Sequence, residues 1–237
     1  MKKILFSLLI IILYSSCEEQ PPVVDTTVSE KKHIQFVNDS ILLEIRKTIQ
    51  TGDILLRTGT DFSSDQIKEM CKIDKTYSHA GIVVAEKDSV FIYSIEPDYY
   101  YIKDKVRKES LDSFCNPSKN YGVGIGRYNL SPNEKISFLA YLEEQYQKKI
   151  PFDMLFGLET DDKMYCSEMI KKGLATSTNN RIVIKTDLLD DRSKYRIIKR
   201  YFKVEEKRFA NMKVVMVDRL FLNPHCTMLK KFRFAGN

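Results

Sequence analysis

The sequence predicts an α+β fold in which a small antiparallel sheet packs against helices. Two apolar runs, residues 80–85 and 90–95, are separated by only four residues, which suits a hairpin of antiparallel strands. Helical patterns stand before and after this hairpin and do not alternate with strands as in regular βαβ units. The chain has 237 residues, 43% of them hydrophobic, so it is long enough for one domain, which we expect over residues 31–237.

The first half of the domain begins with a helix and a strand. Apolar residues recur at intervals of three and four over residues 37–49, which predicts a helix. Thr51 and Gly52 end it, and residues 53–57 form a short apolar run typical of a buried strand. Residues 63–72 predict a further helix just before the hairpin.

The second half contains one strongly marked helix start. After a predicted strand at residues 121–128, Ser131, Pro132 and Glu134 provide the cap, the first helical position and the third-position acid of a capping box. We expect that helix to reach about Gln147. Another helix is expected around Cys166, and late strands are expected at residues 197–201 and 214–217.

The N-terminus carries an export signal. Lys2 and Lys3 precede the apolar residues 4–14, which reach about half of the ~20 residues needed to span a bilayer. Ser15, Ser16 and Cys17 follow, and this arrangement resembles a bacterial lipoprotein signal, in which the cysteine is lipidated after cleavage. The alternative is an ordinary signal peptide, with no role for Cys17.

These features predict an exported protein of the bacterial cell envelope. Residues 1–16 are the predicted signal peptide, and a lipid on Cys17 is expected to hold the protein at the membrane. Residues 17–30, which are rich in Glu, Pro, Thr and Val, are expected to form a flexible tether. The rest of the chain contains no second long apolar run, which excludes a multi-pass membrane protein.

Charge and cysteine content narrow the function classes further. The formal net charge of +6 is modest and scattered, and no basic helix or basic stripe interleaved with aromatics is present, so nucleic acid is not an expected partner. The five cysteines form no CxxC pair and the three histidines are scattered, so we expect no metal site. The sequence leaves the disulfide pairing of Cys71, Cys115 and Cys226 open.

His79 and Glu96 stand at opposite ends of the predicted hairpin. His79 precedes its first strand and Glu96 follows its second, so pairing of the strands can bring the carboxylate beside the imidazole. A carboxylate against one ring nitrogen fixes the tautomer and stabilises the imidazolium. Taken alone, the pattern favours a structural role for His79 and a solvated loop acid for Glu96.

Cys166 stands at the predicted start of an apolar helix. Unpaired backbone N–H groups and the helix dipole favour a thiolate there, and the same amides can stabilise an oxyanion. The alternative is a structural cysteine without reactivity.

Four short segments, in a fixed order along the chain, link His79, Glu96 and Cys166 to one protein family. Residues 52–56 (GDILL), 77–82 (YSHAGI), 94–97 (SIEP) and 165–168 (YCSE) resemble the permuted papain-like family. This family includes the YiiX-like bacterial amidases and relatives of the NlpC-type peptidases and of lecithin–retinol acyltransferase. The resemblance implies a permuted papain-like (NlpC-type) fold, in which the catalytic histidine precedes the cysteine along the chain.

The resemblance also implies a cysteine hydrolase that works through a thioester. Cys166 would be the nucleophile, His79 the base and Glu96 the acid that orients the histidine, with no cofactor or metal required. Tyr77 or Tyr165 would line the oxyanion pocket. Structural support is expected from Asp53, Ser78 and Glu168.

Three hypotheses about the function follow. The favoured substrate is an amide, in a cell-wall peptide or a small amino-acid conjugate. The alternative is a lipid acyl group, with the protein acting as a hydrolase or acyltransferase on the same triad. A non-catalytic binding lipoprotein is the third possibility, because a fold alone does not guarantee activity. Residues 98–101 (DYYY) are a candidate aromatic wall for any of these ligands.

Overall fold

The computed structural model describes residues 26–97, 105–189 and 212–236. Several predicted features therefore lie outside the described residues. These are the signal peptide at residues 1–16, Cys17, the first part of the tether, the aromatic segment at residues 98–101 and the strand at residues 197–201.

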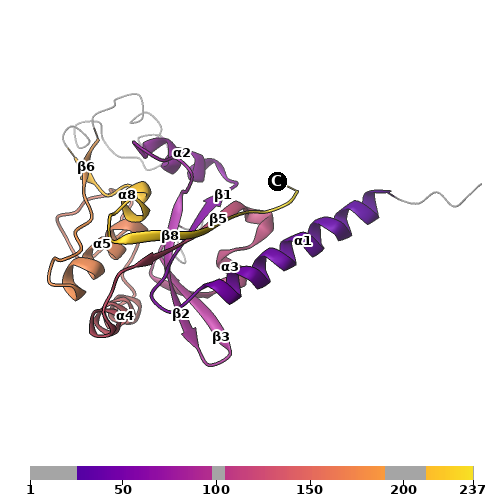
Figure 1. Cartoon of the computed structure of the whole chain (residues 1–237). Coiled ribbons are helices and arrows are strands. Elements are labelled where there is room, and N and C mark those ends of the chain that lie inside the picture. The colour runs from indigo at the N-terminus through magenta and orange to yellow at the C-terminus, as the bar shows by residue number, and fades with distance from the viewer. Residues whose placement is uncertain (1–25, 98–104, 190–211, 237) are drawn as a thin grey trace, which may run out of the picture.

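A six-stranded sheet forms the centre of the protein, with the strand order β4-β3-β2-β1-β5-β8 (Figure 1). Every neighbouring pair in it is antiparallel, which confirms the predicted α+β class. Its strands are β1 (Ile54–Gly59), β2 (His79–Glu86), β3 (Ser89–Ser94), β4 (Arg107–Ser110), β5 (Asn120–Tyr128) and β8 (Cys226–Arg233). A separate two-stranded ladder joins β6 (Asp187–Leu188) to β7 (Lys213–Val214).

The described helices are α1 (Thr26–Thr48), α2 (Phe62–Met70), α3 (Leu111–Phe114), α4 (Pro132–Gln147), α5 (Cys166–Ser177) and α8 (Val217–Phe221), with a 3-10 turn at Pro117–Lys119. The four predicted helices correspond to α1, α2, α4 and α5, of which α1 starts earlier than expected, whereas α3 and α8 were not predicted. The predicted capping box at Ser131 is present and starts α4. Because α1 already begins at Thr26, the last part of the predicted tether is helical. Among the described residues, no helix has the length and apolar character needed to cross a membrane.

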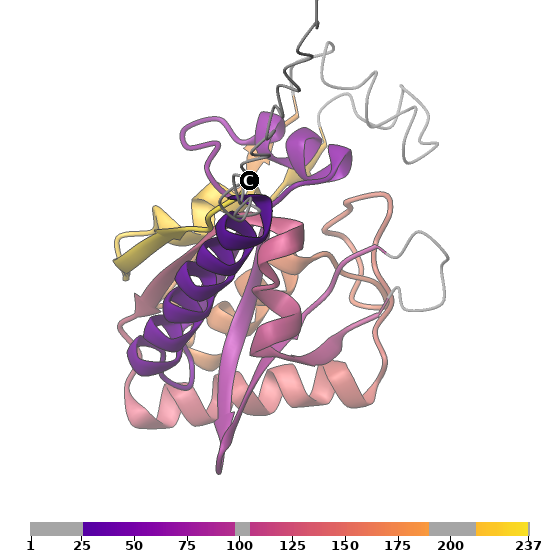
Figure 2. The same cartoon turned by 90° about the vertical axis from the view of Figure 1, so that its right-hand side faces the viewer.

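Helices cover both faces of the sheet (Figures 1 and 2). Side chains of a strand alternate between its two faces, so Leu56 joins a core with Phe138 of α4 and Ile170 of α5, whereas Leu55 joins a second core with Ile45 of α1. Helices α4 and α5 therefore pack on one face, and α1 and α3 on the other. The first residue of α5 is Cys166, so this packing also fixes the candidate nucleophile against the sheet.

The C-terminal part of the chain differs from the prediction. Residues 214–217 were expected to form a strand, but only Val214 belongs to β7, and α8 starts at Val217. The sequence patterns also missed β8, which pairs with β5 and closes one edge of the sheet. Residues 214–217 instead cross the start of α5, where they line the candidate site.

Candidate active site

His79, Cys166 and Glu96 line one pocket. His79 is the first residue of β2, where it pairs with Arg57 of β1. Cys166 is the first residue of α5, and Glu96 lies two residues beyond the end of β3. The structure thus brings together the three residues that the sequence pattern singled out, from three different elements.

The turn that carries Cys166 is held by polar contacts on both sides. The Tyr165 backbone N–H donates to the Glu168 carboxylate (3.4 Å), and Lys172 Nζ lies 2.8 Å from the same carboxylate. The Ser167 hydroxyl donates to the Val215 carbonyl (2.6 Å), and the Val215 N–H donates to the Tyr165 hydroxyl (2.8 Å). Glu168, for which the sequence predicts a supporting role, is fully buried, and burial raises its pKa to about 7 despite Lys172.

The environment of the Cys166 thiol differs from the expectation of a resting thiolate. Burial raises the pKa of the Cys166 thiol to about 11, and the negative charge of Glu96 acts in the same direction. The backbone N–H groups of Ala80 and Ser167 favour the thiolate, but they do not outweigh burial. The thiol is therefore protonated at neutral pH, and a base must remove its proton during the reaction.

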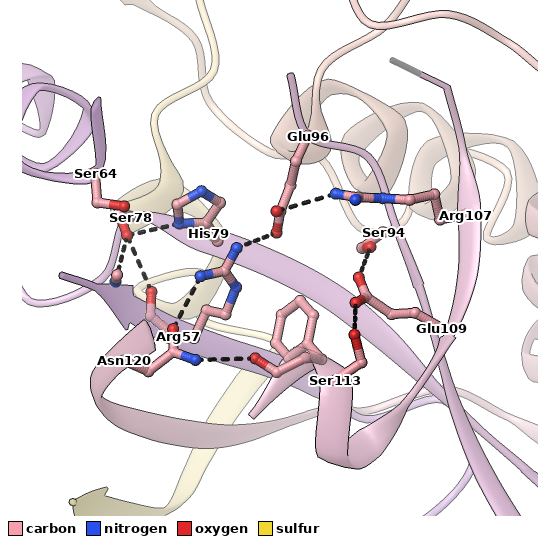
Figure 3. Close-up of polar contacts among 12 residues, drawn as sticks. Arg57, Ser64, Ser78, His79, Ser94, Glu96, Arg107, Glu109, Ser113 and Asn120 are labelled. Atoms are coloured by element: carbon pink, nitrogen blue, oxygen red, sulfur yellow. Dashed lines mark hydrogen bonds and ion pairs between the residues drawn. The ribbon is translucent and has the colours of Figure 1, made fainter. Parts of the chain in front are cut away.

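The ring of His79 is held by its neighbour in the chain. Nδ1 lies 2.7 Å from the Ser78 hydroxyl oxygen, which also accepts the Gly59 N–H (3.0 Å) and lies 3.3 Å from the Arg57 carbonyl oxygen (Figure 3). Ser78 itself is buried. Burial lowers the pKa of His79 to about 4, and the positive charge of Arg57 adds to this effect, while Glu96 and Asp61 oppose it. The imidazole is therefore neutral at neutral pH.

Glu96 is bound by two arginines that the sequence analysis did not identify. Arg57 Nη2 lies 2.5 Å from one carboxylate oxygen and Arg107 Nη2 lies 3.0 Å from the other (Figure 3). Burial alone would raise the pKa of Glu96, but the charges of Arg57, His79 and Arg107 together lower it to about 2. The expected hydrogen bond from the imidazole N–H to Glu96 is absent from the described structure, where both carboxylate oxygens accept from arginines and Nδ1 contacts Ser78.

Arg57 is itself fixed by further contacts. Its Nη1 donates to the Asn120 side-chain oxygen (2.9 Å), and its guanidinium lies 5.3 Å from the centroid of the Phe114 ring. An arginine opposite His79 on the neighbouring strand becomes visible only once the register of β1 and β2 is known. For Arg107 no signal in the sequence points to the site.

The two tyrosines proposed for the oxyanion pocket have different positions. Tyr165 lines the pocket, and its ring lies 5.1 Å from that of Phe156. Tyr77 is absent from the pocket lining and packs edge-on against Phe221, with 5.3 Å between ring centroids. Its hydroxyl lies over Gly124, where an added Cβ would come within 2.2 Å of it. Tyr77 is thus part of the core between β5 and α8.

Asp53 supports the sheet at a distance from the pocket. The buried carboxylate accepts from Arg127 Nε (2.6 Å) and from the Gln50 backbone N–H (2.7 Å), so it ties the start of β1 to β5. The four described cysteines are Cys71, Cys115, Cys166 and Cys226, and all are free thiols.

The remainder of the pocket is mainly apolar. Side chains of α2 form one wall, and residues beyond α4 and before α8 form the others. The apolar lining consists of Ile67, Met70, Ile95, Pro97, Phe152, Phe156, Val214, Val215, Met216 and Val217. A ligand group that reaches Cys166 therefore meets mostly hydrocarbon.

Comparisons with known proteins agree with this arrangement. Residues 48–229 match the family model described as "Permuted papain-like amidase enzyme, YaeF/YiiX, C92 family". The fold is similar to the crystal structure of the metalloprotein YiiX from Escherichia coli O157:H7, with a TM-score of 0.62 and 20% sequence identity. That likeness covers 78% of this chain and 98% of the YiiX chain. No curated protein matches the sequence.

The description of YiiX as a metalloprotein raises the question of a metal site in this chain. Within the described ranges, no group of three or more His, Cys, Asp or Glu side chains is placed so that it could hold a metal ion. The described residues therefore do not fit such a site, and the chemistry below rests on the side chains themselves.

Proposed function

Since the chain belongs to the family of permuted papain-like amidases of the YaeF/YiiX type, we propose that it is a cysteine amidase of the bacterial cell envelope. Cys166 is the nucleophile and His79 the base, while Glu96 supports His79 through its charge. The observation that carries this proposal is the shared pocket, in which a thiol at the first position of α5 and a neutral imidazole at the first position of β2 face one ligand space.

The first step is attack with concerted proton transfer. Because the Cys166 thiol and the His79 imidazole are both neutral at rest, the thiol proton moves to His79 as sulfur attacks the amide carbonyl. This transfer needs an unprotonated ring nitrogen. Ser78 provides it when Nδ1 carries the ring proton and donates to the Ser78 hydroxyl, which leaves Nε2 free to accept.

The start of α5 stabilises the tetrahedral intermediate. The Cys166 N–H belongs to the first turn of a helix of 12 residues, where backbone donors lack intrahelical acceptors and the helix dipole favours negative charge. This N–H is the donor that we assign to the oxyanion. Tyr165, which lines the same wall, is a further candidate for contact with the substrate.

Three proton transfers complete the cycle. The His79 imidazolium protonates the leaving amine, and the C–N bond breaks to leave a thioester on Cys166. His79 then removes a proton from water, which attacks the thioester carbonyl. The C–S bond breaks to release the carboxylic acid, and the His79 imidazolium returns its proton to the sulfur of Cys166.

The arginine pair gives Glu96 a defined electrostatic role. The carboxylate stabilises the imidazolium that forms after each proton transfer to His79. Arg57 and Arg107 keep that carboxylate ionised, so it does not take the proton itself.

The substrate assignment follows from the family and from the pocket. The family points to an amide, and we favour one in a cell-wall peptide or a small amino-acid conjugate. The apolar walls favour a substrate that carries a hydrocarbon group close to the scissile bond. This observation supports the second candidate, a lipid acyl hydrolase or acyltransferase that uses the same Cys166 and His79.

We further propose that residues 1–16 are a signal peptide and that a lipid on Cys17 anchors the protein at the membrane. The support is the basic, apolar and small-residue sequence of this segment, which ends at a cysteine. Incorporation of labelled fatty acid into the wild-type chain and its loss in Cys17→Ser tests this anchor. Equal labelling of both proteins would contradict it.

Turnover of matched substrates tests the proposed activity. The full chain is assayed with an N-acyl amino acid, an ester of the same acyl group and a peptide amide, beside Cys166→Ala and the control Cys226→Ala. Amide cleavage that only Cys166→Ala abolishes supports the amidase. Cleavage of the ester alone favours the lipid acyl hydrolase, and binding of the substrates without turnover would overturn catalysis.

A further inference from the structure

One face of α1 carries large apolar side chains that no other described part of the chain covers. Val28, Phe36 and Leu43 are 47%, 70% and 53% exposed. Leu43 follows Phe36 by seven residues, about 20° short of two helical turns, and Phe36 follows Val28 by eight residues, about 80° beyond two turns, so all three lie within an arc of about 80° on one side of the helix. A single exposed apolar side chain is ordinary, but an aligned row marks a contact surface.

This outer face is separate from the face that attaches α1 to the protein. Ile41, Leu42 and Ile45 pack on the sheet in the core that Leu55 shares. Figure 1 shows the N-terminal part of α1 extending beyond the sheet, with its far end away from the rest of the fold. The apolar row is therefore not required to hold the helix in place.

Two lysines lie along the same face, one between Val28 and Phe36 and one beyond Leu43. Lys32 lies four residues before Phe36, and Lys47 lies four residues after Leu43, so both are on the same face. Both are exposed, and neither makes an ion pair in the described part of the chain. Asp39 is the exposed carboxylate on this face, and it leaves the two lysines in excess. Apolar side chains flanked by lysines are typical of a helix that lies in a membrane interface.

The position of α1 in the chain indicates that its exposed face contacts the membrane. Thr26, the first residue of α1, follows Cys17 by nine positions, which extend at most about 30 Å. We propose that Val28, Phe36 and Leu43 insert into the interface of an anionic membrane while Lys32 and Lys47 contact its headgroups. This docking rests on the proposed anchor at Cys17 and adds a second contact, one that fixes the orientation of the domain.

A tryptophan reporter tests the docking directly. The chain contains no tryptophan, so Phe36→Trp places a unique fluorophore on the outer face of α1. Ile136→Trp is the matched control, because Ile136 is 66% exposed on α4, on the opposite side of the sheet. The full chain is reconstituted into vesicles of phosphatidylethanolamine and phosphatidylglycerol whose acyl chains carry bromine, a contact quencher of tryptophan.

Docking predicts blue-shifted emission and strong quenching for Phe36→Trp, and neither for Ile136→Trp. Adding Lys32→Gln or Lys47→Gln is expected to lower the ratio of docked to free domain about fivefold for each lysine lost. Vesicles of phosphatidylcholine alone, which attract neither lysine, should lower this ratio as much as the loss of both lysines does.

Three results would overturn docking. Quenching of Phe36→Trp that is no stronger than that of Ile136→Trp would show that the outer face has no preferred contact with lipid. Emission that is blue-shifted but unquenched would show that protein, and not lipid, covers the face. A blue shift that is independent of protein density would assign the face to the chain's own N-terminal segment. A blue shift that grows with protein density would assign it to a second copy of the chain. Association of the chain with vesicles tests the lipid anchor at Cys17, and substrate turnover in the same samples tests the amidase activity. A failure of docking can therefore be distinguished from a failure of the anchor or of the amidase.

Discussion

The hydroxyl oxygen of Ser78 lies 2.7 Å from Nδ1 of His79. The same oxygen accepts the Gly59 N–H and lies within hydrogen-bond distance of the Arg57 carbonyl. A hydroxyl has one proton and two lone pairs, so all three contacts are satisfied when Nδ1 carries the ring proton. On this account the residue next to the histidine sets its tautomer, and the more distant Glu96 contributes charge.

Removing the Ser78 hydroxyl is expected to slow the reaction without unfolding the protein. Ser78→Ala loses about one hydrogen bond to the ring, so kcat/KM should fall roughly tenfold. Nitrogen NMR of His79 should show a single tautomer in the wild type and a mixture in the variant. Ser94→Ala is the control, because Ser94 is an equally buried serine whose hydroxyl donates to Glu109, away from the pocket. An unchanged rate and spectrum in Ser78→Ala would remove Ser78 from the mechanism.

The pH profile reports the protonation of His79. His79 must be neutral to accept the thiol proton, and burial together with Arg57 lowers its pKa to about 4. In the free enzyme, kcat/KM should therefore be level around neutral pH and fall as the pH drops through about 4.

Substitution of Arg57 should change the pH at which kcat/KM falls in acid, here called the acid limb of the profile. Arg57→Gln removes a positive charge beside the ring, so the limb should shift upward, toward the ordinary pKa of 6.5. Arg107→Gln should shift it less, because Arg107 acts more weakly on His79. An acid limb near 6.5 in the wild type would contradict the buried, neutral imidazole.

Glu96→Gln is expected to lower stability as well as activity. It leaves Arg57 and Arg107 without their shared carboxylate, which should cost on the order of 3 kcal/mol in the free energy of unfolding. The folded-state pKa of Glu96 is about 2, below its ordinary 4.5, so this contribution is complete above about pH 4.5 and is lost as the pH falls toward 2.

Denaturant titrations of wild type and Glu96→Gln at several pH values measure this difference. The gap in unfolding free energy should be constant near neutral pH and should narrow in acid. A gap that stays the same down to pH 2, or that is missing at pH 7, would show that the arginine pair does not depend on the Glu96 charge.

Tyr77→Phe is expected to leave turnover unchanged. The Tyr77 hydroxyl packs over Gly124 and the ring packs on Phe221, so it stands outside the pocket. Steady-state kinetics of Tyr77→Phe beside wild type check this assignment. A fall in kcat of tenfold or more, with the fold intact, would return Tyr77 to the oxyanion pocket.

Local sequence signals predicted most of the fold that positions the site. The capping box at Ser131 determined the start of α4, and the short link between two apolar runs determined the β2–β3 hairpin. The start of the apolar helix at Cys166 was visible for the same reason. Each of these signals lies within a few neighbouring residues.

Features that depend on distant parts of the chain were not predictable in this way. Glu96 meets Arg57 and Arg107 only because β1, β3 and β4 lie in one sheet, and no local pattern records that pairing. The same applies to β8, whose partner β5 lies about a hundred residues earlier. The thiolate expected at Cys166 depended on the helix dipole and the unpaired backbone N–H groups of the first turn, whereas burial raises the pKa of the thiol.

Trapping of the acyl-enzyme tests the central claim most directly. The full chain is mixed with an N-acyl amino acid, quenched in acid and mapped by mass spectrometry, beside Cys166→Ala, His79→Gln and the control Cys226→Ala. The account predicts a thioester on Cys166 in wild type and Cys226→Ala, none in Cys166→Ala, and a much slower appearance in His79→Gln. Turnover by Cys166→Ala, or an acyl group on any other residue, would contradict it.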